Sequence, residues 1–226
     1  MNLKGYRHPK DIILQSVRWY LRYNLSYRDL EEMLEERGVF VDHTSIFRWV
    51  QRWTPEPLAA FKERKAHAGD RWRLDETYVK VSGQHRFLYR AVDRAGDTID
   101  FLLTARRDAA AALRFLEKAI GQNGLPSFIN IDKSGANKAG IEAYNDAYDG
   151  PAIEIRQCKY LNNSVEQDHR NIKRRTRSML GFKSFWTARV VLGGIELVHM
   201  LRKGQLASAP RQALISAAEA FYGLAA

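Results

Sequence analysis

Three strand-like runs, separated by connections too short for a crossover, constrain the fold of this chain more than any other feature. The runs cover residues 71–81, 85–93 and 97–104, and the connections are Ser82–Gln84 and Arg94–Gly96. Strands joined this closely pair with their sequence neighbours as antiparallel hairpins, since a parallel crossover needs a dozen or more residues. The sequence therefore predicts a three-stranded antiparallel meander.

Helix and strand patterns alternate after the meander. The expected elements are an alanine-rich helix from about Asp108 to Ile120, a buried strand at 128–132, a helix near 136–147, a short strand at 152–156, and long helices at about 163–177 and 185–203. This element order is that of an RNase H-like fold with a mixed sheet. We expect an α/β domain over residues 71–205, followed by a weakly patterned tail at 206–226.

The residues before the meander predict a small all-α domain at 1–56 and a polar linker at 57–70. A first helix is expected at 10–23, and Ser26 with Asp29 forms a capping-box pair at the start of a second. Gly38 is expected to end the second helix.

A third helix follows, capped by Asp42 or Thr44 and ended by Pro55 and Pro57. The polar side of this helix offers donors for base edges or phosphates, among them Arg48, Gln51 and Arg52. Two helices joined by a short glycine-containing turn are typical of a DNA-reading helix-turn-helix. An ordinary three-helix interaction domain with a solvated face gives the same pattern.

The distribution of charge indicates a polyanionic partner. The formal net charge is +10, of which residues 158–226 contribute +7 and residues 70–157 contribute none. Such clustering favours nucleic acid over an acidic membrane surface, although basic charge can also serve solubility alone. The single cysteine, Cys158, excludes an internal disulfide, and no Cys/His cluster has zinc spacing, so any metal would need oxygen ligands. No apolar run resembles a membrane span or signal peptide, which predicts a cytoplasmic protein.

Three acidic residues occupy positions where an RNase H-like sheet would gather them. Asp75 lies in the first strand, Asp132 ends the fourth, and Glu166 begins the long helix that follows. Ligands collect beyond the carboxyl ends of strands, although Asp132 can also serve as N-cap of the next helix. Asp75 and Glu76 face opposite sides of their strand, and the apolar neighbours on the face of Glu76 favour Asp75 without deciding the matter.

Basic residues follow Glu166 on one side of its helix. Lys173 lies two turns after Glu166, and Arg170 lies between them. A solvated helix with internal ion pairs has the same pattern. Three carboxylates can hold two Mg²⁺ ions about 4 Å apart, an arrangement that activates the attacking oxygen and stabilises the leaving oxygen in phosphodiester transfer.

Four segments of the sequence carry a family resemblance: WRLDETYVKV, HRFLYRAVDRAGDTIDFLLTARRDAAAALRFL, INIDKSGAN and CKYLNNSVEQDHRNIKRRTRSMLGFKSFWTAR. They resemble the DDE transposases of bacterial insertion sequences, specifically the insertion-sequence-six family, and the likeness spans nearly the full chain. The resemblance implies a catalytic and metal-binding triad of Asp75, Asp132 and Glu166, with Lys173 as the basic residue seven positions after the glutamate. It thereby selects Asp75 over Glu76.

The resemblance also implies an activity and its partners. The family recognises short terminal inverted repeats, cleaves DNA to give a 3′-OH, and transfers the strand into a target, forming cointegrates by replicative transposition. We accordingly expect two Mg²⁺ ions, with Mn²⁺ as substitute, double-stranded DNA at the element ends and target, and a homodimer or larger assembly at the bacterial nucleoid. The expected DNA contacts are Arg48, Gln51, Arg52, Arg170, Lys173, Arg174, Arg175 and Arg177. The alternatives are a related DDE recombinase or nuclease, and an inactive descendant that binds DNA as a repressor.

Overall fold

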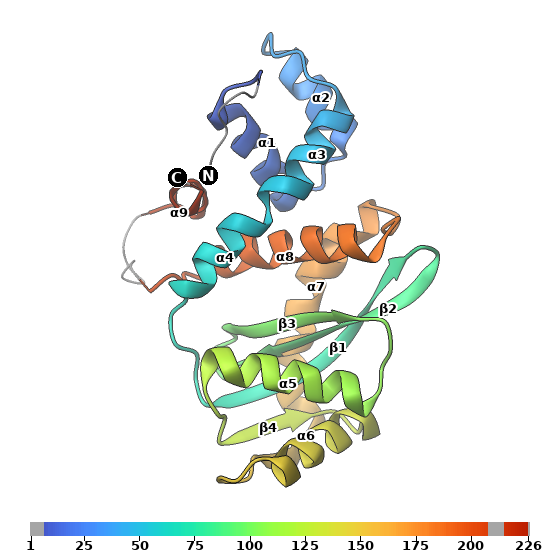
Figure 1. Ribbon diagram of the computed structural model, residues 1–226, viewed down its shortest axis with the longest axis vertical. Helices are drawn as coiled ribbons and strands as arrows, with labels where there is room; N and C mark the ends of the chain where they lie inside the picture. The colour runs from blue at the N-terminus through green and yellow to red at the C-terminus, as the bar shows by residue number, and fades with distance from the viewer. Residues whose placement is uncertain (1–6, 208–214, 226) are drawn as a thin grey trace. The chain divides into compact units, whose positions relative to one another are not determined.

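A five-stranded mixed sheet forms the centre of residues 67–173 in the computed structural model, which describes residues 7–207 and 215–225 (Figure 1). Its strands are β1 (Arg71–Val81), β2 (Gln84–Val92), β3 (Thr98–Thr104), β4 (Phe128–Ile131) and β5 (Glu154–Gln157), in the order β3-β2-β1-β4-β5. β1, β2 and β3 are antiparallel, whereas β4 runs parallel to β1 and β5. The predicted meander and the mixed RNase H-like sheet are confirmed.

Two helices cover one face of this sheet, α5 (Ala109–Asn123) and α6 (Gly135–Ala147). The Asp108 carboxylate caps α5 by accepting a hydrogen bond from the Ala111 amide. Trp72 on β1 and Phe115 on α5 are fully buried in the core between sheet and helices, where each large apolar side chain contributes about 1.5–3 kcal/mol. Gly140 permits the close approach of α6 to α5, because a Cβ there would lie 2.6 Å from the Cβ of Ala112.

The opposite face of the sheet meets the short 3₁₀ helix η1 (Lys159–Asn162) and the start of α7 (Asn163–Ser178). Asn130 of β4 is fully buried there and donates from Nδ2 to the Asn162 Oδ1 at 2.6 Å and to the Cys158 carbonyl at 2.9 Å. Its own Oδ1 accepts from the Cys158 amide. These bonds fix the point at which α7 leaves the sheet.

The second compact unit combines residues 1–66 with residues 174–226 and is helical. Besides the end of α7, its helices are α1 (Lys10–Arg22), α2 (Tyr27–Glu35), α3 (His43–Trp53), α4 (Pro55–Glu63), α8 (Phe185–Arg202) and α9 (Ala217–Leu224). Ser26 and Asp29 form the predicted capping box of α2, and the Asp42 carboxylate accepts from the Thr44 amide at the start of α3. The three N-terminal helices predicted from the sequence are present.

The structure corrects the prediction of an irregular linker at 57–70, because α4 covers its first half. Pro55 does follow the end of α3, but it also occupies the first position of α4, where a missing N–H breaks no helical bond. Phe61 of α4 is fully buried, which gives this mainly polar segment an apolar side. The predicted tail at 206–226 likewise contains α9; residues 208–214 and 226 lie outside the described part.

The division between the units also differs from the predicted boundary at residue 205. α8 is buried along nearly its whole length and packs against α1 and α4, so it belongs to the helical unit rather than to the sheet. Gly194 lets α8 approach its neighbours closely, since a Cβ there would lie 2.5 Å from a methyl group of Leu21. Among the described residues, no helix has both the length and the apolar character of a membrane span.

Candidate active site

The parallel pairing of β1 with β4 brings Asp75 and Asp132 level with each other. Arg73 pairs with Asn130, and continuing this register by two residues on each strand aligns Asp75 with Asp132. Asp132 follows the last residue of β4, and its carboxylate accepts a hydrogen bond from the Ser134 amide at 2.9 Å. The N-cap of α6 is Ser134. Asp132 is therefore placed at the carboxyl end of its strand and does not occupy the N-cap position.

Asp75 and Glu76 point to opposite faces of the sheet. Asp75 lies beside Arg90 of β2 on the face that meets α7, whereas Glu76 lies on the α5–α6 face among buried side chains. The side chain of Glu76 is only 3% exposed, and its carboxylate accepts from Asn137 Nδ2 and pairs with Arg107. The two neighbouring carboxylates thus have separate environments, and Asp75 is the one on the side of Glu166.

Negative charge accumulates around Asp75. Burial raises the pKa of its carboxyl to about 7, with further contributions from the charges of Glu76, Asp132 and Glu166. Asp132 is level with Asp75 across the paired strands, and Glu166 lies on α7, the helix that meets the same face of the sheet as Asp75. Ionising all three together is unfavourable without a cation among them.

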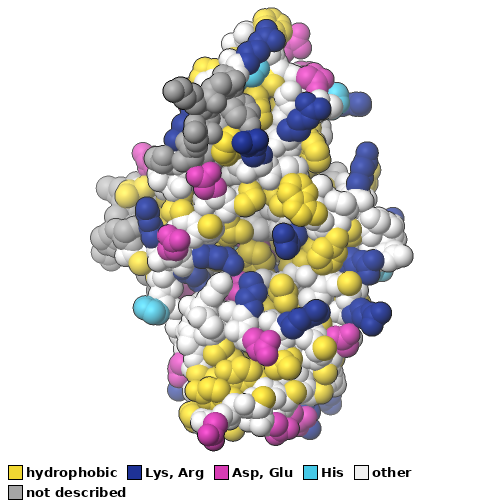
Figure 2. Space-filling view, viewed as in Figure 1, with side chains coloured by type: hydrophobic (Ala, Val, Ile, Leu, Met, Phe, Trp, Pro, Cys, Tyr) yellow, Lys and Arg dark blue, Asp and Glu magenta, His cyan; other side chains and the backbone are white. Residues whose placement is uncertain are grey.

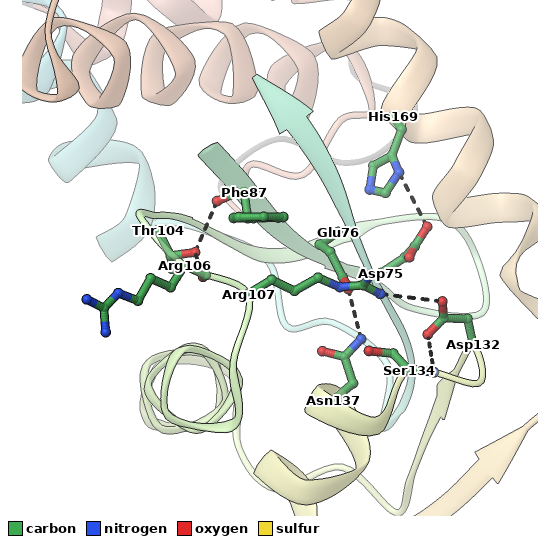
Figure 3. A network of polar contacts seen from close by, with 10 residues as sticks. All are labelled: Asp75, Glu76, Phe87, Thr104, Arg106, Arg107, Asp132, Ser134, Asn137 and His169. Carbon is green, nitrogen blue, oxygen red and sulfur yellow. Dashed lines mark hydrogen bonds and ion pairs between the residues drawn. The ribbon is translucent and has the colours of Figure 1, made fainter. Parts of the chain in front are cut away.

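A buried histidine contacts Asp75 and was not predicted from the sequence. His169 lies on α7, and its Nδ1 is 3.5 Å from Oδ2 of Asp75 (Figure 3). Burial lowers the pKa of His169 to about 3, helped by the charges of Arg90 and Lys173, so the ring is neutral at physiological pH. The available signal was its position three residues after Glu166, one helical turn along α7.

A buried ion pair holds α7 against the sheet. The guanidinium of Arg90 on β2 is completely buried and donates from Nη2 to Oδ2 of Asp168 at 2.5 Å. Asp168 precedes His169, so the pair lies next to the contact with Asp75. Together with the anchor between Asn130 and Asn162, this pairing fixes the register of α7 on the sheet and hence the position of Glu166.

The exposed side of α7 presents the predicted stripe. Glu166, Arg170, Lys173 and Arg177 are exposed at spacings of four, three and four residues, as helical geometry requires for one face. Lys173 lies one turn after His169 on α7, and its charge contributes to the lowered pKa of that ring. Arg174 is also exposed.

Arg175 is a correction to the predicted DNA contacts. Its side chain is buried, and its guanidinium donates to the Asn24 Oδ1 at 2.7 Å and to the carbonyls of Tyr20 and Leu21 at the end of α1. Burial also lowers the pKa of this guanidinium to about 10. A cation engaged in this way is not available to a phosphate, and its role is to join the end of α7 to α1.

Of the three residues on α3 that were predicted to contact DNA, two are exposed and one is buried. Arg48 and Arg52 are exposed on α3, as predicted. Gln51 is 6% exposed and lies on the buried side of the helix, close enough to Tyr27 to influence the pKa of its hydroxyl. The prediction of a DNA contact at Gln51 is therefore wrong in this structure, because the polar side of α3 is narrower than its sequence suggests.

Basic side chains are dispersed on the face of the molecule shown in Figure 2. Within each unit, the Lys and Arg residues on this face are interspersed with acidic and hydrophobic ones. The assignment of DNA contacts on that face therefore depends on individual residues and their neighbours rather than on one basic surface.

A second polar network links Glu76 to Asp132 through Arg107 (Figure 3). Arg107 follows β3, and its Nε pairs with the buried Glu76 carboxylate while its Nη2 lies 3.8 Å from Oδ2 of Asp132. Burial lowers the pKa of this guanidinium, but the charges of Glu76 and Asp132 more than compensate and raise it. No role for Arg107 was predicted from the sequence.

The donor set fits hard divalent cations. Asp75, Asp132 and Glu166 offer only carboxylate oxygens, the ligands that Mg²⁺ prefers. Burial chiefly, and the neighbouring carboxylates in addition, raise the pKa of Asp75, and a dication at this position would favour its ionised form. Cys158, the only cysteine, lies after β5 and makes no contact with these acids in the described interactions.

Comparisons with known proteins cover most of the chain. A family model described as a DDE domain matches residues 69–205. Transposases from Staphylococcus aureus match over 205 residues and 90% of both chains, with 41% identity for the insertion sequence-like element IS431mec and 40% for the element IS257 in transposon Tn4003. Among solved structures, the HTLV-2 integrase catalytic core domain in complex with magnesium (trimeric form) gives 16% identity and a TM-score of 0.46, covering 60% of this chain and 88% of that one. The simian T-cell lymphotropic virus intasome in complex with a PP2A regulatory subunit gives 16% and 0.48, covering 80% and 72%.

Proposed function

The chain belongs to the insertion-sequence-six family of DDE transposases, and from this premise we propose that it binds the terminal inverted repeats of an insertion sequence and catalyses metal-dependent strand cleavage and strand transfer. The observation that carries the proposal is that Asp132 is level with Asp75 across the paired strands, while α7, the helix that carries Glu166, is held beside Asp75 through His169. Replicative, cointegrate-forming transposition is the expected mode.

In this proposal Asp75, Asp132 and Glu166 hold Mg²⁺, with two ions and Mn²⁺ as a functional substitute. Bound ions of this kind activate the attacking oxygen and stabilise the leaving oxygen of the phosphodiester. The protein's own contribution is to fix the carboxylates. His169 contacts Asp75, and the ion pair of Arg90 with Asp168 fixes the helix that carries Glu166.

The substrates in this proposal are double-stranded DNA at the element ends and at the target. Because two ends must be joined to one target, we infer that the active form is a homodimer or a larger assembly at the nucleoid. A strand-transfer assay on labelled end DNA, with Mg²⁺, Mn²⁺ or excess chelator, tests the function. End binding without cleavage in either metal would instead indicate the inactive DNA-binding descendant, and cleavage in excess chelator would contradict the metal mechanism.

Lys173 is expected to hold a phosphate that flanks the scissile bond. Lys173→Ala should reduce strand transfer strongly and make the salt dependence of DNA binding shallower by about one unit of slope, since one phosphate contact is lost. Lys173→Arg should recover part of the activity, because the charge remains while the compact ammonium becomes a planar fork. Strand-transfer rates and filter-binding titrations from low to moderate salt measure both effects.

Lys138 provides the control for Lys173. It is exposed on α6 of the same unit and forms an i,i+4 ion pair with Glu142. Lys138→Ala therefore removes the same charge without touching the side of α7 that carries Glu166. Equal salt slopes and equal rates for the two alanine variants would assign Lys173 to a merely solvated helix face.

Arg48 is expected to read the terminal repeat from the exposed side of α3. Arg48→Ala in the full-length protein should weaken binding to the repeat by about 1–3 kcal/mol and relax selectivity at one base position. Competition binding against systematically altered repeats measures both quantities. The matched control is Arg37→Ala, because Arg37 folds back to donate to the Met33 carbonyl. Equal binding of the wild-type protein to repeat and scrambled DNA would show that this helix does not select the ends.

A further inference from the structure

A hollow of about 490 Å³ lies beside Asp132. Of the residues in the predicted site, only Asp132 lines it. Its lining consists of Arg107, Asp132, Lys133, Ser134, Gly135 and Ala136. Two of these side chains are cations, on two different connections of the sheet: Arg107 follows β3, and Lys133 follows β4. The hollow is therefore bordered by two cations and by one of the three predicted carboxylates.

Arg107 is held at the edge of the hollow by residues that do not line it. Glu76 is buried on β1, where Asn137 Nδ2 donates to its carboxylate at 2.9 Å and Arg107 Nε pairs with the same carboxylate. A buried carboxylate needs such partners, and here they fix the guanidinium at its Nε edge. No hydrogen bond of the two Nη atoms is found in the described part of the chain, and Nη2 lies 3.8 Å from Oδ2 of Asp132, at ion-pair distance. The Nη end of the guanidinium, which suits a phosphate, is thus held in a fixed position.

The charges around the hollow explain which ligand it suits. Glu76 and Asp132 are balanced by Arg107 and Lys133, so the four groups sum to zero before any dication binds at Asp132. Without Arg107 the same surface would carry net negative charge and would repel DNA. A guanidinium whose Nη–H groups make no hydrogen bond to the protein can bind a phosphate through paired donors.

We propose that Arg107 binds a phosphate of the DNA strand acted on beside Asp132, with Glu76 and Asn137 serving as its positioning residues. The inference rests on the proposed function, since it takes DNA to be the substrate. It adds a residue outside the family triad and outside the basic stripe of α7, on the opposite side of β1 from Asp75. The strand would then be held from both sides of the carboxylates, by Arg107 and by Lys173.

Arg106 supplies a matched control for Arg107. The two arginines are adjacent and both exposed, but Figure 3 shows the side chain of Arg106 directed away from Arg107 and the carboxylates. Arg107→Gln and Arg106→Gln remove the same charge from the same connection. We expect Arg107→Gln to weaken binding of end DNA roughly 10- to 100-fold and to lower the salt slope by about one, since a charge-assisted contact is lost. Arg106→Gln should bind DNA like the wild type.

Neutralising one phosphate of the DNA at a time locates the phosphate that Arg107 contacts. End DNA is prepared with a single neutral methylphosphonate at each position around the cleavage site in turn. Wild-type protein in Ca²⁺, which allows binding without requiring turnover, should lose affinity at the position that Arg107 contacts, and Arg107→Gln should show no further loss there. An equal loss for both proteins at every position would overturn the proposal. Because the readout is binding, an absence of cleavage by the wild type would contradict the proposed function without touching this result.

The double variant Glu76→Gln/Arg107→Gln separates phosphate binding from support of the fold. Arg107→Gln alone leaves a buried carboxylate without its cation and risks misfolding, whereas the double variant replaces the ion pair by two neutral amides that can hydrogen-bond. We expect the double variant to recover thermal stability but to keep the weak DNA affinity and the shallow salt slope. Recovery of wild-type affinity together with stability would show that Arg107 only neutralises Glu76 and would overturn the inference.

Discussion

Asp75→Asn, Asp132→Asn and Glu166→Gln are each expected to abolish strand cleavage and joining while leaving binding to the element ends largely intact. Each change removes a charged oxygen ligand and leaves the shape of the side chain and the N-terminal helix α3 unchanged. Losing about 4 kcal/mol of transition-state stabilisation corresponds to roughly a thousandfold in rate. Single-turnover cleavage of uncut end DNA and joining of pre-cut end DNA, each in Mg²⁺ and Mn²⁺, measure the loss. A mobility-shift titration measures binding.

Glu76→Gln is the informative comparison for Asp75. The two acids are neighbours in the sequence, but Glu76 is 3% exposed on the α5–α6 face and is paired with Arg107. Its amide variant should slow the reaction modestly through Arg107 and should keep the dependence on metal concentration. A loss as complete as that of Asp75→Asn would indicate that the metal site lies on the α5–α6 face of β1, which would contradict the proposal. Substantial cleavage by any folded variant of the three acids would refute the triad.

The sequence was sufficient for the sheet because hairpin pairing depends on local signals, whereas the choice of Asp75 over Glu76 needed the family resemblance. Short turns dictate that β1, β2 and β3 pair as hairpins. The separation of 57 residues between Asp75 and Asp132 equals the offset between paired residues of β1 and β4, such as Arg73 with Asn130. Placing an acid at the end of an apolar run therefore predicted a spatial neighbour without any knowledge of side-chain contacts.

Burial of polar residues was the part that periodicity did not predict. On α7, Val165 and Ile172 mark the buried side, and the same spacing continues through Asp168 and His169 to Arg175. Charged residue types suggested solvent at Asp168 and Arg175, but each has a specific partner from a distant segment. Such partners are set by tertiary packing, so residue type alone gives the wrong side of the helix.

The compact units differ from the predicted domain bounds for a related reason. α8 is apolar all round, which predicts burial but does not say against which elements. In the structure it packs with α1 and α4, so segments from both ends of the chain form one helical unit. Arg107 was overlooked because its partners, Glu76 and Asp132, are 31 and 25 residues away and meet it only through the strand order of the sheet.

Arg90→Met is expected to cause the largest loss of stability, because it leaves the Asp168 carboxylate buried without its cation. Breaking one side of a buried ion pair costs about 3–5 kcal/mol in the free energy of unfolding. The double variant Arg90→Met/Asp168→Leu should recover most of this loss, since apolar side chains of similar size replace a buried ion pair at little or no cost. Urea unfolding followed by far-ultraviolet circular dichroism and tryptophan fluorescence measures all three proteins.

Lys138→Met is the control for this prediction, because it breaks an ion pair whose two side chains are about half exposed. Exposed pairs of this kind contribute little, so its unfolding midpoint should match that of the wild type. If Arg90→Met also unfolds at the wild-type midpoint, water must reach Asp168, and the pair cannot be what fixes the register of α7. If the double variant regains stability but its cleavage remains slow, the ion pair acts through the placement of Glu166 and not through the stability of the fold.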